Sequence, residues 1–391
     1  MSRPTSVMSG VGIWFVGARG SVATTTTVGL LAIRSRLAGH TGMVSELPEV
    51  AAAGLASLDD IVVGGHEVAE GTLGKRAEEL SAGGVFSPAL ATVLAGDLAA
   101  ADERIRPGVV AGQGTQRSAA ERVEAELRAF RDEHGLERVV VVDVSSTEPP
   151  AGDVPALGTL AALEAALDAG ESPLPGSSLY AYAAFRAGCP YVAFTPSPGP
   201  RVPALAELAL ERGVPWTGSD AKTGETLVKT VLGPMFAMRA LKVRSWSSVN
   251  LLGGGDGQTL ADPDNAASKI ATKANGLESI LGHPVDGPLH IDYVPDLGDW
   301  KTAWDLVSFD GFLGTRMSMQ FTWSGCDSSL AAPLVLDLVR LVARAHELGA
   351  AGPLPQFGFF FKDPVASDVH ALSTQWEALV SWCERAGRGA V

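Results

Sequence analysis

Short apolar runs alternate with amphipathic stretches along the first part of the chain, up to about residue 240. The runs are too short for buried helices and are bounded by glycine, proline or polar residues, so they predict buried strands. The predicted strands cover 11–16, 61–66, 139–144, 191–194 and 214–216, and the predicted helices cover 21–37, 117–135, 157–167, 178–187 and 204–212. Alternating strands and helices predict an α/β fold with a doubly wound parallel sheet.

The pattern changes after Lys242, where strand-like runs follow one another without intervening helices. These runs lie at 244–250, 289–293, 303–309 and 317–323, and helical spacing returns at 333–347 and 375–388. We therefore predict a Rossmann-like nucleotide-binding domain at 1–245, an inserted, mainly β domain at 246–332, and a C-terminal return to the first domain at 333–391.

The first predicted strand leads into a glycine-containing turn and then a helix, an order that presents free backbone N–H groups to a phosphate. Gly17 and Gly20 have the spacing GxxG rather than the full GxGxxG, so an ordinary tight turn is the alternative reading. Ser21, Val22 and Thr24 open the helix and are candidate dinucleotide contacts.

Polar residues follow several other predicted strands, where ligands bind in doubly wound sheets. Residues 43–46 have the pattern of a strand end, and Glu46 is a candidate acceptor for ribose hydroxyls, with a plain surface acid as the alternative. His66 ends another strand, and either a structural or a cofactor role suits it. Further candidates for the cofactor site after later strands are Asp143, Ser145, Ser146 and Thr195.

A second turn of the same kind runs from Gly218 to Lys229 and lacks the Walker spacing of a nucleotide P-loop. Its small polar residues before a helix suit the phosphate of a substrate. Asp220 stands at the start of this turn.

Composition narrows the possible partners. The formal net charge of −14 argues against nucleic acid and against a membrane surface. Three widely spaced cysteines show no metal-binding spacing and indicate a reducing compartment. No apolar run is long enough to cross a membrane, and no signal-type segment is evident, so we expect a cytoplasmic protein.

Lysine is rare, and its distribution is uneven. Of the 30 basic residues, eight are lysine, and three of these, Lys269, Lys273 and Lys301, fall close together. Lys362 follows three phenylalanines and is predicted to lie at the end of a buried apolar strand, where a lysine needs a partner or a function. A buried ammonium has a readily lowered pKa and so can exchange protons, although chance clustering on a solvated helix is the alternative.

Short motifs at 44–48, 146–149, 194–199, 222–230, 250–257, 268–269, 301–303, 311–314 and 359–362 lie in register along the chain. Together they make the chain resemble the myo-inositol-phosphate synthase family, especially its short, archaeal-type branch. The resemblance runs from about Val11 to Pro364.

The resemblance implies a modified Rossmann domain with an inserted catalytic and tetramerisation sheet, and a homotetramer. It also implies NAD as a cofactor that is used and regenerated within one turnover. The expected substrate is glucose 6-phosphate, which would be oxidised at C5, enolised towards C6, closed by aldol attack of C6 on C1, and reduced again at C5.

The resemblance also assigns site residues. The active-site lysines fall on Lys269, Lys273, Lys301 and Lys362, which suit an enolate and an aldol alkoxide because fixed ammonium groups stabilise developing oxyanions. Lys269 with Asp220 suggests a proton relay at the C5 oxygen, Lys273 suits the phosphate, and Asp327 would orient Lys301 or Lys362. The expected substrate-binding residues are Thr223, Gly224, Glu225, Asn250, Leu252 and Gly254. Asp256 matches an acid that binds a cation in some members, and the cation itself stays open.

One departure from the family pattern concerns the substrate. Glycines occupy 253–255, where the family commonly carries side chains, and a wider pocket would change the sugar more readily than the chemistry. Fructose 6-phosphate is therefore a second candidate, because the same steps would give a five-membered carbocycle of the kind used for carbocyclic nucleosides. A non-cyclising NAD-dependent dehydrogenase is a third reading, and the four matched lysines argue against it.

Overall fold

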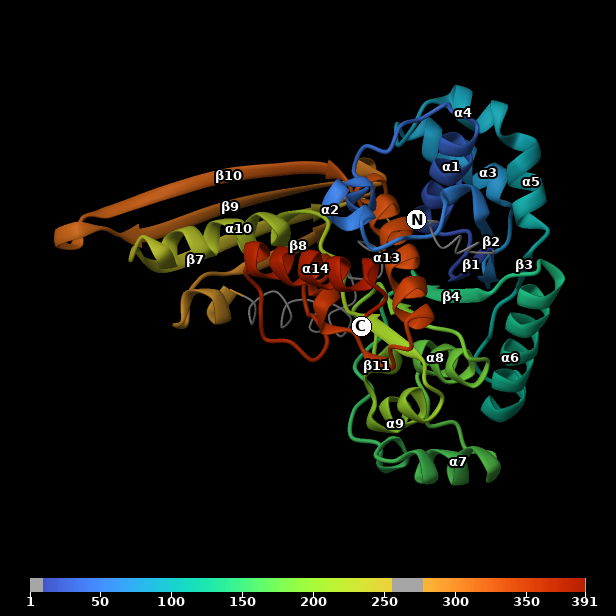
Figure 1. Ribbon diagram of the computed structural model, residues 1–391. Coiled ribbons are helices and arrows are strands. Elements are labelled where there is room, and N and C mark those ends of the chain that lie inside the picture. Colours follow the sequence, from blue (N-terminus) through green and yellow to red (C-terminus); the bar gives the residue numbers. More distant parts are fainter. Residues whose placement is uncertain (1–9, 255–276, 391) are drawn as a thin grey trace.

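The computed structural model describes residues 10–254 and 277–390. It has an α/β body and a long β arm that projects from one side of the body (Figure 1). Among the helices in these two ranges, none has both the length and the apolar character needed to cross a membrane.

Within the described residues, seven parallel strands form the sheet of the body, in the order β11-β6-β5-β4-β1-β2-β3. Their bounds are β1 Val11–Val16, β2 Ile61–Glu67, β3 Ile105–Pro107, β4 Arg138–Asp143, β5 Tyr191–Ala193, β6 Pro215–Gly218 and β11 Gly352–Pro353. Because β1 lies between β2 and β4, the strand order reverses there, and ligands of doubly wound sheets bind in the crevice at such a switch point.

Helices cover both faces of this sheet because its central strands are apolar on both sides. In β1, Ile13 and Phe15 pack into one core with α1, α3, α13 and α14, whereas Trp14 and Val16 pack into the other core with α6, α7, α8 and α9. The helices are α1 Ser21–Arg34, α2 Pro48–Ala51, α3 Leu73–Ala82, α4 Pro88–Val93, α5 Ala95–Asp102, α6 Gln116–Glu133, α7 Leu160–Asp168, α8 Gly176–Arg186, α9 Pro203–Glu211, α10 Glu225–Met238, α13 Asp327–Glu347 and α14 Leu372–Gly387.

The arm is a second sheet in the order β10-β9-β7-β8. Its strands are β7 Lys242–Leu252, β8 Leu289–Tyr293, β9 Trp300–Asp310 and β10 Arg316–Cys326. Phe236 of α10 packs on one face with Trp246 and Val307, so α10 lies along the arm (Figure 1). The other face carries exposed Trp300 and Trp304.

The chain returns to the body through α13, which begins directly after β10, and then through β11 and α14. The α/β fold with a second, mostly antiparallel sheet is thus confirmed. The predicted domain limits stay predictions. The proposed boundary at residue 245 falls inside β7, and the one at residue 332 falls inside α13.

Two local predictions are wrong. Residues 44–46 form a turn of 3-10 helix rather than a strand end, because the Val44 and Ser45 N–H groups donate to Asp337 of α13 at 2.8 and 3.0 Å. The second strand is β2. Residues 359–362 are not a strand either, since a 3-10 helix covers Pro355–Phe360 and only Phe361 forms a bridge, to Ala221.

His346 near the end of α13 should make the fold sensitive to acid. Burial lowers the pKa of His346 to about 4, and its Nδ1 has no hydrogen-bond partner among the described residues. The unfolded chain, with a histidine pKa of about 6.5, therefore binds more protons than the folded chain between pH 6.5 and 4. The free energy of unfolding should fall by about 3 kcal/mol over that window as pH decreases.

Denaturant unfolding at several pH values checks this prediction. We expect His346→Leu to lose that part of the pH dependence, and His290→Leu, at an exposed position, to keep it. Parallel pH profiles for the wild type and His346→Leu would contradict the assignment.

Candidate functional site

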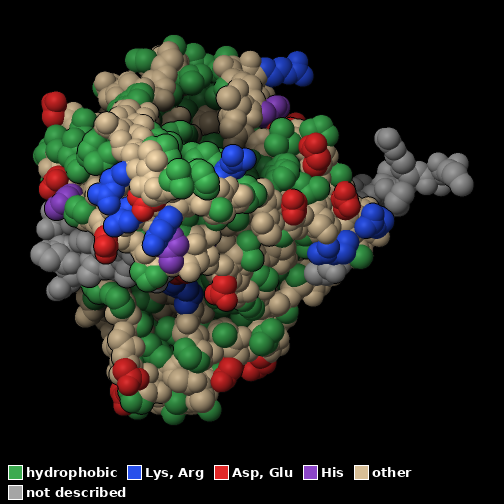
Figure 2. Space-filling view, turned by 90° about the vertical axis from the view of Figure 1, so that its left-hand side faces the viewer, with side chains coloured by type: hydrophobic (Ala, Val, Ile, Leu, Met, Phe, Trp, Pro, Cys, Tyr) green, Lys and Arg blue, Asp and Glu red, His purple; other side chains and the backbone are tan. Residues whose placement is uncertain are grey.

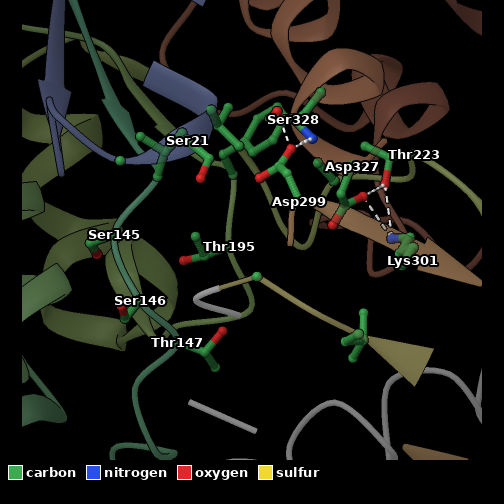
Figure 3. Close-up of a pocket in the computed structure, with 18 of the residues that line it drawn as sticks. Ser21, Ser145, Ser146, Thr147, Thr195, Thr223, Asp299, Lys301, Asp327 and Ser328 are labelled. Atoms are coloured by element: carbon green, nitrogen blue, oxygen red, sulfur yellow. Dashed lines mark hydrogen bonds and ion pairs between the residues drawn. The ribbon is translucent and has the colours of Figure 1, made fainter. Parts of the chain in front are cut away.

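A cavity of about 280 Å³ lies where the carboxyl edge of the parallel sheet meets the arm. The β1–α1 turn and the loops after β4 and β5 line one side, and the loop after β6 lines the other together with the ends of β7, β9 and β10. Figure 3 shows Ser21, Ser145 and Ser146 on the first wall, and Thr223, Lys301 and Asp327 on the facing wall.

The turn between β1 and α1 has the geometry of an anion site. Gly17 has a φ of 86°, and a Cβ there would come within 3.1 Å of the Ser145 backbone. Gly20 caps α1 without a side-chain hydrogen bond, so the first amides of this helix have no side-chain cap. Helix-terminal amides of this kind bind phosphate groups.

A second cavity, of about 660 Å³, adjoins the first and shares Gly20, Arg76, Ser145 and Ser146 with it. Glu67, the last residue of β2, lines this second cavity. The Glu67 carboxylate accepts the N–H groups of Arg19, Val68 and Ala69 at 2.8, 2.8 and 3.0 Å, which fixes it beside the turn.

Glu67 therefore occupies the position that sequence reasoning gave to Glu46. Glu46 lines neither cavity and pairs with Arg340 of α13 at 2.5 Å. The signal for Glu67 was present in the sequence, as an acid directly after the strand 61–66. The prediction of a strand end at 43–46 assigns that position to Glu46 instead.

Most of the other predicted cofactor residues line one or both cavities, and two of them are buried behind the cavity walls. Ser21, Val22, Thr195 and Asp220 line the first cavity, Gly17 lines the second, and Gly20, Ser145 and Ser146 line both. Thr24 and Asp143 are buried behind the walls. Asp143 accepts the Ser145 hydroxyl and the Tyr191 hydroxyl at 2.6 and 2.9 Å, and so holds Ser145 in place, while burial raises the pKa of Asp143.

The polar groups along the two cavities fit a dinucleotide. An uncapped helix terminus, hydroxyl groups after β4 and an acid after β2 meet along two adjoining cavities. In addition, Thr195 Oγ1 and Asp220 Oδ2 are buried without a hydrogen-bond partner within the described ranges. Buried polar atoms in a native protein normally have partners, so a polar ligand is expected there.

We predict that Glu67→Gln weakens NAD binding about 10- to 100-fold, because a charge-assisted hydrogen bond contributes roughly 1.5–3 kcal/mol. Titration calorimetry with NAD measures the change. Glu46→Gln is the matched control and should keep the Kd of the wild type. Equal losses in the two variants would contradict the placement of the ribose at Glu67.

On the facing wall, Lys301 at the start of β9 pairs with Asp327, the first residue of α13, at 2.7 Å. The Thr223 hydroxyl donates to the same Asp327 oxygen at 2.8 Å and lies 3.5 Å from the Lys301 ammonium (Figure 3). The side chain of Lys301 is only 15% exposed, which limits the solvent screening of this pair.

Lys362 forms a second pair, donating to Asp220 Oδ1 at 2.6 Å. The two side chains are 8% and 5% exposed, so the burial expected for Lys362 is present and its charge is compensated. Asp220 has a φ of 58°, a left-handed conformation that aspartate tolerates better than most residues. Both pairs face the same cavity.

The turn at 222–225 places the N-terminus of α10 between these pairs. Gly224 packs closely there, because a Cβ would come within 3.2 Å of Lys301 Cε and 3.1 Å of Trp323 Nε1. A small cavity of about 20 Å³ is lined by Gly224, Glu225, Asn250, Leu252, Lys301 and Lys362, among others. The helix terminus and two ammonium groups make it suitable for an anion.

The glycines after β7 do not simply enlarge the pocket. A Cβ on Gly253 would lie 2.5 Å from the Gly298 nitrogen and from Leu297 Cβ, so the neighbouring loop already fills that space. Gly254 lines the first cavity and has looser surroundings. The predicted residues Asp256, Lys269 and Lys273 lie outside the described residues.

Asp299 is a second residue whose role the sequence did not reveal. It lies on the wall of the first cavity, two residues before Lys301, and accepts the N–H of Ser328 at 3.1 Å. Within residues 10–254 and 277–390, no group of three or more histidine, cysteine, aspartate or glutamate residues could hold a metal ion.

A switch-point nucleotide cleft faced by two lysine–carboxylate pairs defines the class of protein, a dinucleotide-dependent enzyme. Residues 11–384 match the NAD-binding family described as myo-inositol-1-phosphate synthase. The chain therefore belongs to the myo-inositol-1-phosphate synthase family, and NAD is its cofactor.

Individual relatives agree with this assignment. The chain is 33% identical over 402 residues to inositol-3-phosphate synthase 1 of Bacteroides thetaiotaomicron, over 94% of this chain and 93% of the relative. It is also 33% identical over 302 residues to inositol-3-phosphate synthase of Spirodela polyrhiza, over 74% of this chain and 57% of the relative.

Solved structures support the fold. Inositol-3-phosphate synthase of Caenorhabditis elegans superposes with a TM-score of 0.87 at 21% identity, covering 98% of this chain and 86% of that one. A myo-inositol-1-phosphate synthase-related protein of Thermotoga maritima superposes with a TM-score of 0.77 at 23% identity, covering 96% and 98%.

Proposed function

We propose that the protein cyclises glucose 6-phosphate to a myo-inositol phosphate, by oxidation at C5, enolisation, intramolecular aldol closure and reduction at C5. The observation that carries the proposal is the convergence of Lys301–Asp327 and Lys362–Asp220 on one cavity that adjoins the dinucleotide cleft. A simple dehydrogenase needs one acid–base group, whereas a cyclase must also stabilise an enolate and an alkoxide.

The phosphate of the substrate is assigned to the N-terminus of α10. The turn at Thr223 and Gly224 supplies backbone amides, and Lys301 supplies positive charge from the side of β9. Anchoring the phosphate at one end fixes the sugar carbons relative to Lys362 and Asp220, which lowers the entropic barrier to ring closure.

Proton transfer at the C5 oxygen is assigned to Asp220 and Lys362. Asp220 Oδ2 has no partner among the described groups and is available to a substrate hydroxyl, while Oδ1 is held by Lys362. The Lys362 ammonium stabilises negative charge as it develops on oxygen, and its burial strengthens that interaction. Lys301, oriented by Asp327, acts in the same way on the other side of the cavity.

The dinucleotide would be held by the β1–α1 turn, Ser145, Ser146 and Glu67. When bound, NAD supplies a hydride acceptor at C5 and, once reduced, a hydride donor to the same carbon. The walls of the cavity keep the sugar in place between these two events.

The assembly is proposed to be a homotetramer formed through the arm. Phe312 and Leu313 at the β9–β10 tip are 88% and 87% exposed, and hydrophobic side chains gather at this end of the molecule (Figure 2). Light scattering that gave the mass of one chain would contradict this assembly.

The identity of the reaction product distinguishes the proposed function from its alternatives. The purified protein is incubated with NAD and with either glucose 6-phosphate or fructose 6-phosphate, and the products are identified by NMR. We expect a six-membered cyclitol phosphate from glucose 6-phosphate without net NADH.

A cyclopentane product formed only from the ketose would replace the leading substrate with fructose 6-phosphate. Stable NADH with an open-chain product would leave a non-cyclising dehydrogenase and remove both cyclase assignments.

A further inference from the structure

Helix α13 begins without a cap of its own. Cys326 stands at its N-cap position and makes no side-chain capping hydrogen bond. Instead, the Asp299 backbone carbonyl accepts the Asp327 N–H at 3.1 Å, and Asp299 Oδ2 accepts the Ser328 N–H at 3.1 Å. A residue far away in sequence thus caps the helix, a task that usually falls to the residue before it.

The same carboxylate gathers further donors. Asp299 Oδ2 accepts the Ser328 hydroxyl and, at 3.3 Å, the Cys326 thiol. The Thr25 hydroxyl of α1 donates to the Ser328 hydroxyl at 3.2 Å, which links the cap to the cofactor helix. A negative charge at a helix N-terminus is also favourable towards the helix dipole.

This cap lies next to both members of the Lys301–Asp327 pair. Lys301 follows Asp299 by two residues, and Asp327 is the first residue of the helix that Asp299 caps. We propose that Asp299 is a positioning residue, which holds the start of α13 against the start of β9 and thereby sets the Lys301–Asp327 contact. The kinetic part of this inference rests on the proposed function, because it requires that the Lys301–Asp327 pair takes part in turnover.

The kinetic test compares Asp299→Ala with Asp299→Asn, whose amide oxygen can still accept the Ser328 N–H. We expect Asp299→Ala to lower kcat about 10²-fold, since a displacement of about 1 Å of a reacting group has an effect of this size. Asp299→Asn should recover at least a tenth of the wild-type kcat. NAD affinity should stay close to that of the wild type in both variants, whereas Asp299→Ala should lose about 0.5–2 kcal/mol of stability together with the helix cap.

Thr302→Ala is the matched control. Thr302 is the neighbour of Lys301 in β9, but its side chain lies on the exposed side of the strand pair. The substitution removes the 2.9 Å hydrogen bond between the Thr302 and Ser324 hydroxyls. Its kcat should equal that of the wild type. The inference is overturned if Asp299→Ala keeps more than a third of the wild-type kcat, or if its loss disappears when rates are expressed per NAD-binding site.

A second readout does not depend on turnover. The rate at which an amine-reactive reagent modifies Lys301, followed by peptide mass spectrometry, reports on its ion pair with Asp327. We expect faster modification in Asp299→Ala than in the wild type and in Thr302→Ala, and unchanged modification would overturn the inference. If the wild type cyclised no sugar phosphate but this difference remained, the proposed function would fail and the positioning role would stand.

Discussion

Replacing Lys362 with arginine should abolish turnover and leave the fold intact. Arginine keeps the charge that Asp220 needs, so the buried carboxylate is not left unpaired. However, a guanidinium does not release its proton and is too broad for a site in which lysine is 8% exposed. We expect kcat to fall about 10³-fold, within the range typical for loss of a proton-transfer group.

Product formation at saturating NAD measures this effect, with calorimetry for NAD affinity and thermal unfolding for stability. Lys242→Arg, at an exposed position on β7, is the matched control and should behave like the wild type. Near-normal activity of Lys362→Arg would remove Lys362 from the site.

Replacing Lys229 with methionine should destabilise the protein by about 3–5 kcal/mol, the usual cost of breaking a buried ion pair. Lys229 lies on α10 between Glu225 and Asp305, with its ammonium 3.5 Å from Asp305 and 2.9 Å from the Ser248 hydroxyl. All three charged residues are buried. Without the lysine, two carboxylates would remain side by side away from water.

The loss should depend on pH. Burial and the charge of Glu225 already raise the pKa of Asp305, and removing Lys229 would raise it further. A carboxyl group with a raised pKa in the folded state stabilises the fold at low pH and loses that contribution as pH rises. Lys229→Met should therefore be least impaired under mildly acidic conditions.

Denaturant unfolding at two pH values tests both statements. Lys242→Met removes an exposed lysine and should change the free energy of unfolding by less than about 0.5 kcal/mol. The double variant Glu225→Gln/Lys229→Met should regain part of the loss, because one of the two carboxylates is then neutral. A loss below 1 kcal/mol in Lys229→Met would contradict the buried-triad interpretation.

The alternation of strands and helices in the body was predictable because each central strand is a continuous apolar run with glycine or polar residues at its end. The same rule failed at 43–46, where tertiary contacts decided the structure. Asp337 and Arg340, nearly 300 residues away, bind that segment and hold it in a 3-10 turn. Nothing in the local sequence contains this information.

The rarity of lysine in the sequence pointed to candidate site residues, but it did not separate lysines that face the cavity from lysines buried elsewhere. Lys301 and Lys362 face the cavity. Lys222 is also a buried lysine, and burial lowers its pKa to about 7. Its ammonium, however, donates a hydrogen bond to Gln375 of α14. Position relative to the cavity, which depends on the whole fold, separates the two cases. Asp299 was missed for the same reason, because its partner Ser328 is distant in sequence.

The β9–β10 hairpin leaves the cavity at Lys301 and returns to it at Asp327, with its tip at 311–314. Side chains alternate between the two faces of a strand, so a slip of pairing by one residue would turn Lys301 away from the cavity. The turn at the tip, where Leu313 has a φ of 60° and Gly314 a φ of 73°, fixes that pairing. An insertion or deletion of a single residue at the far end of the arm should therefore disturb the Lys301–Asp327 contact.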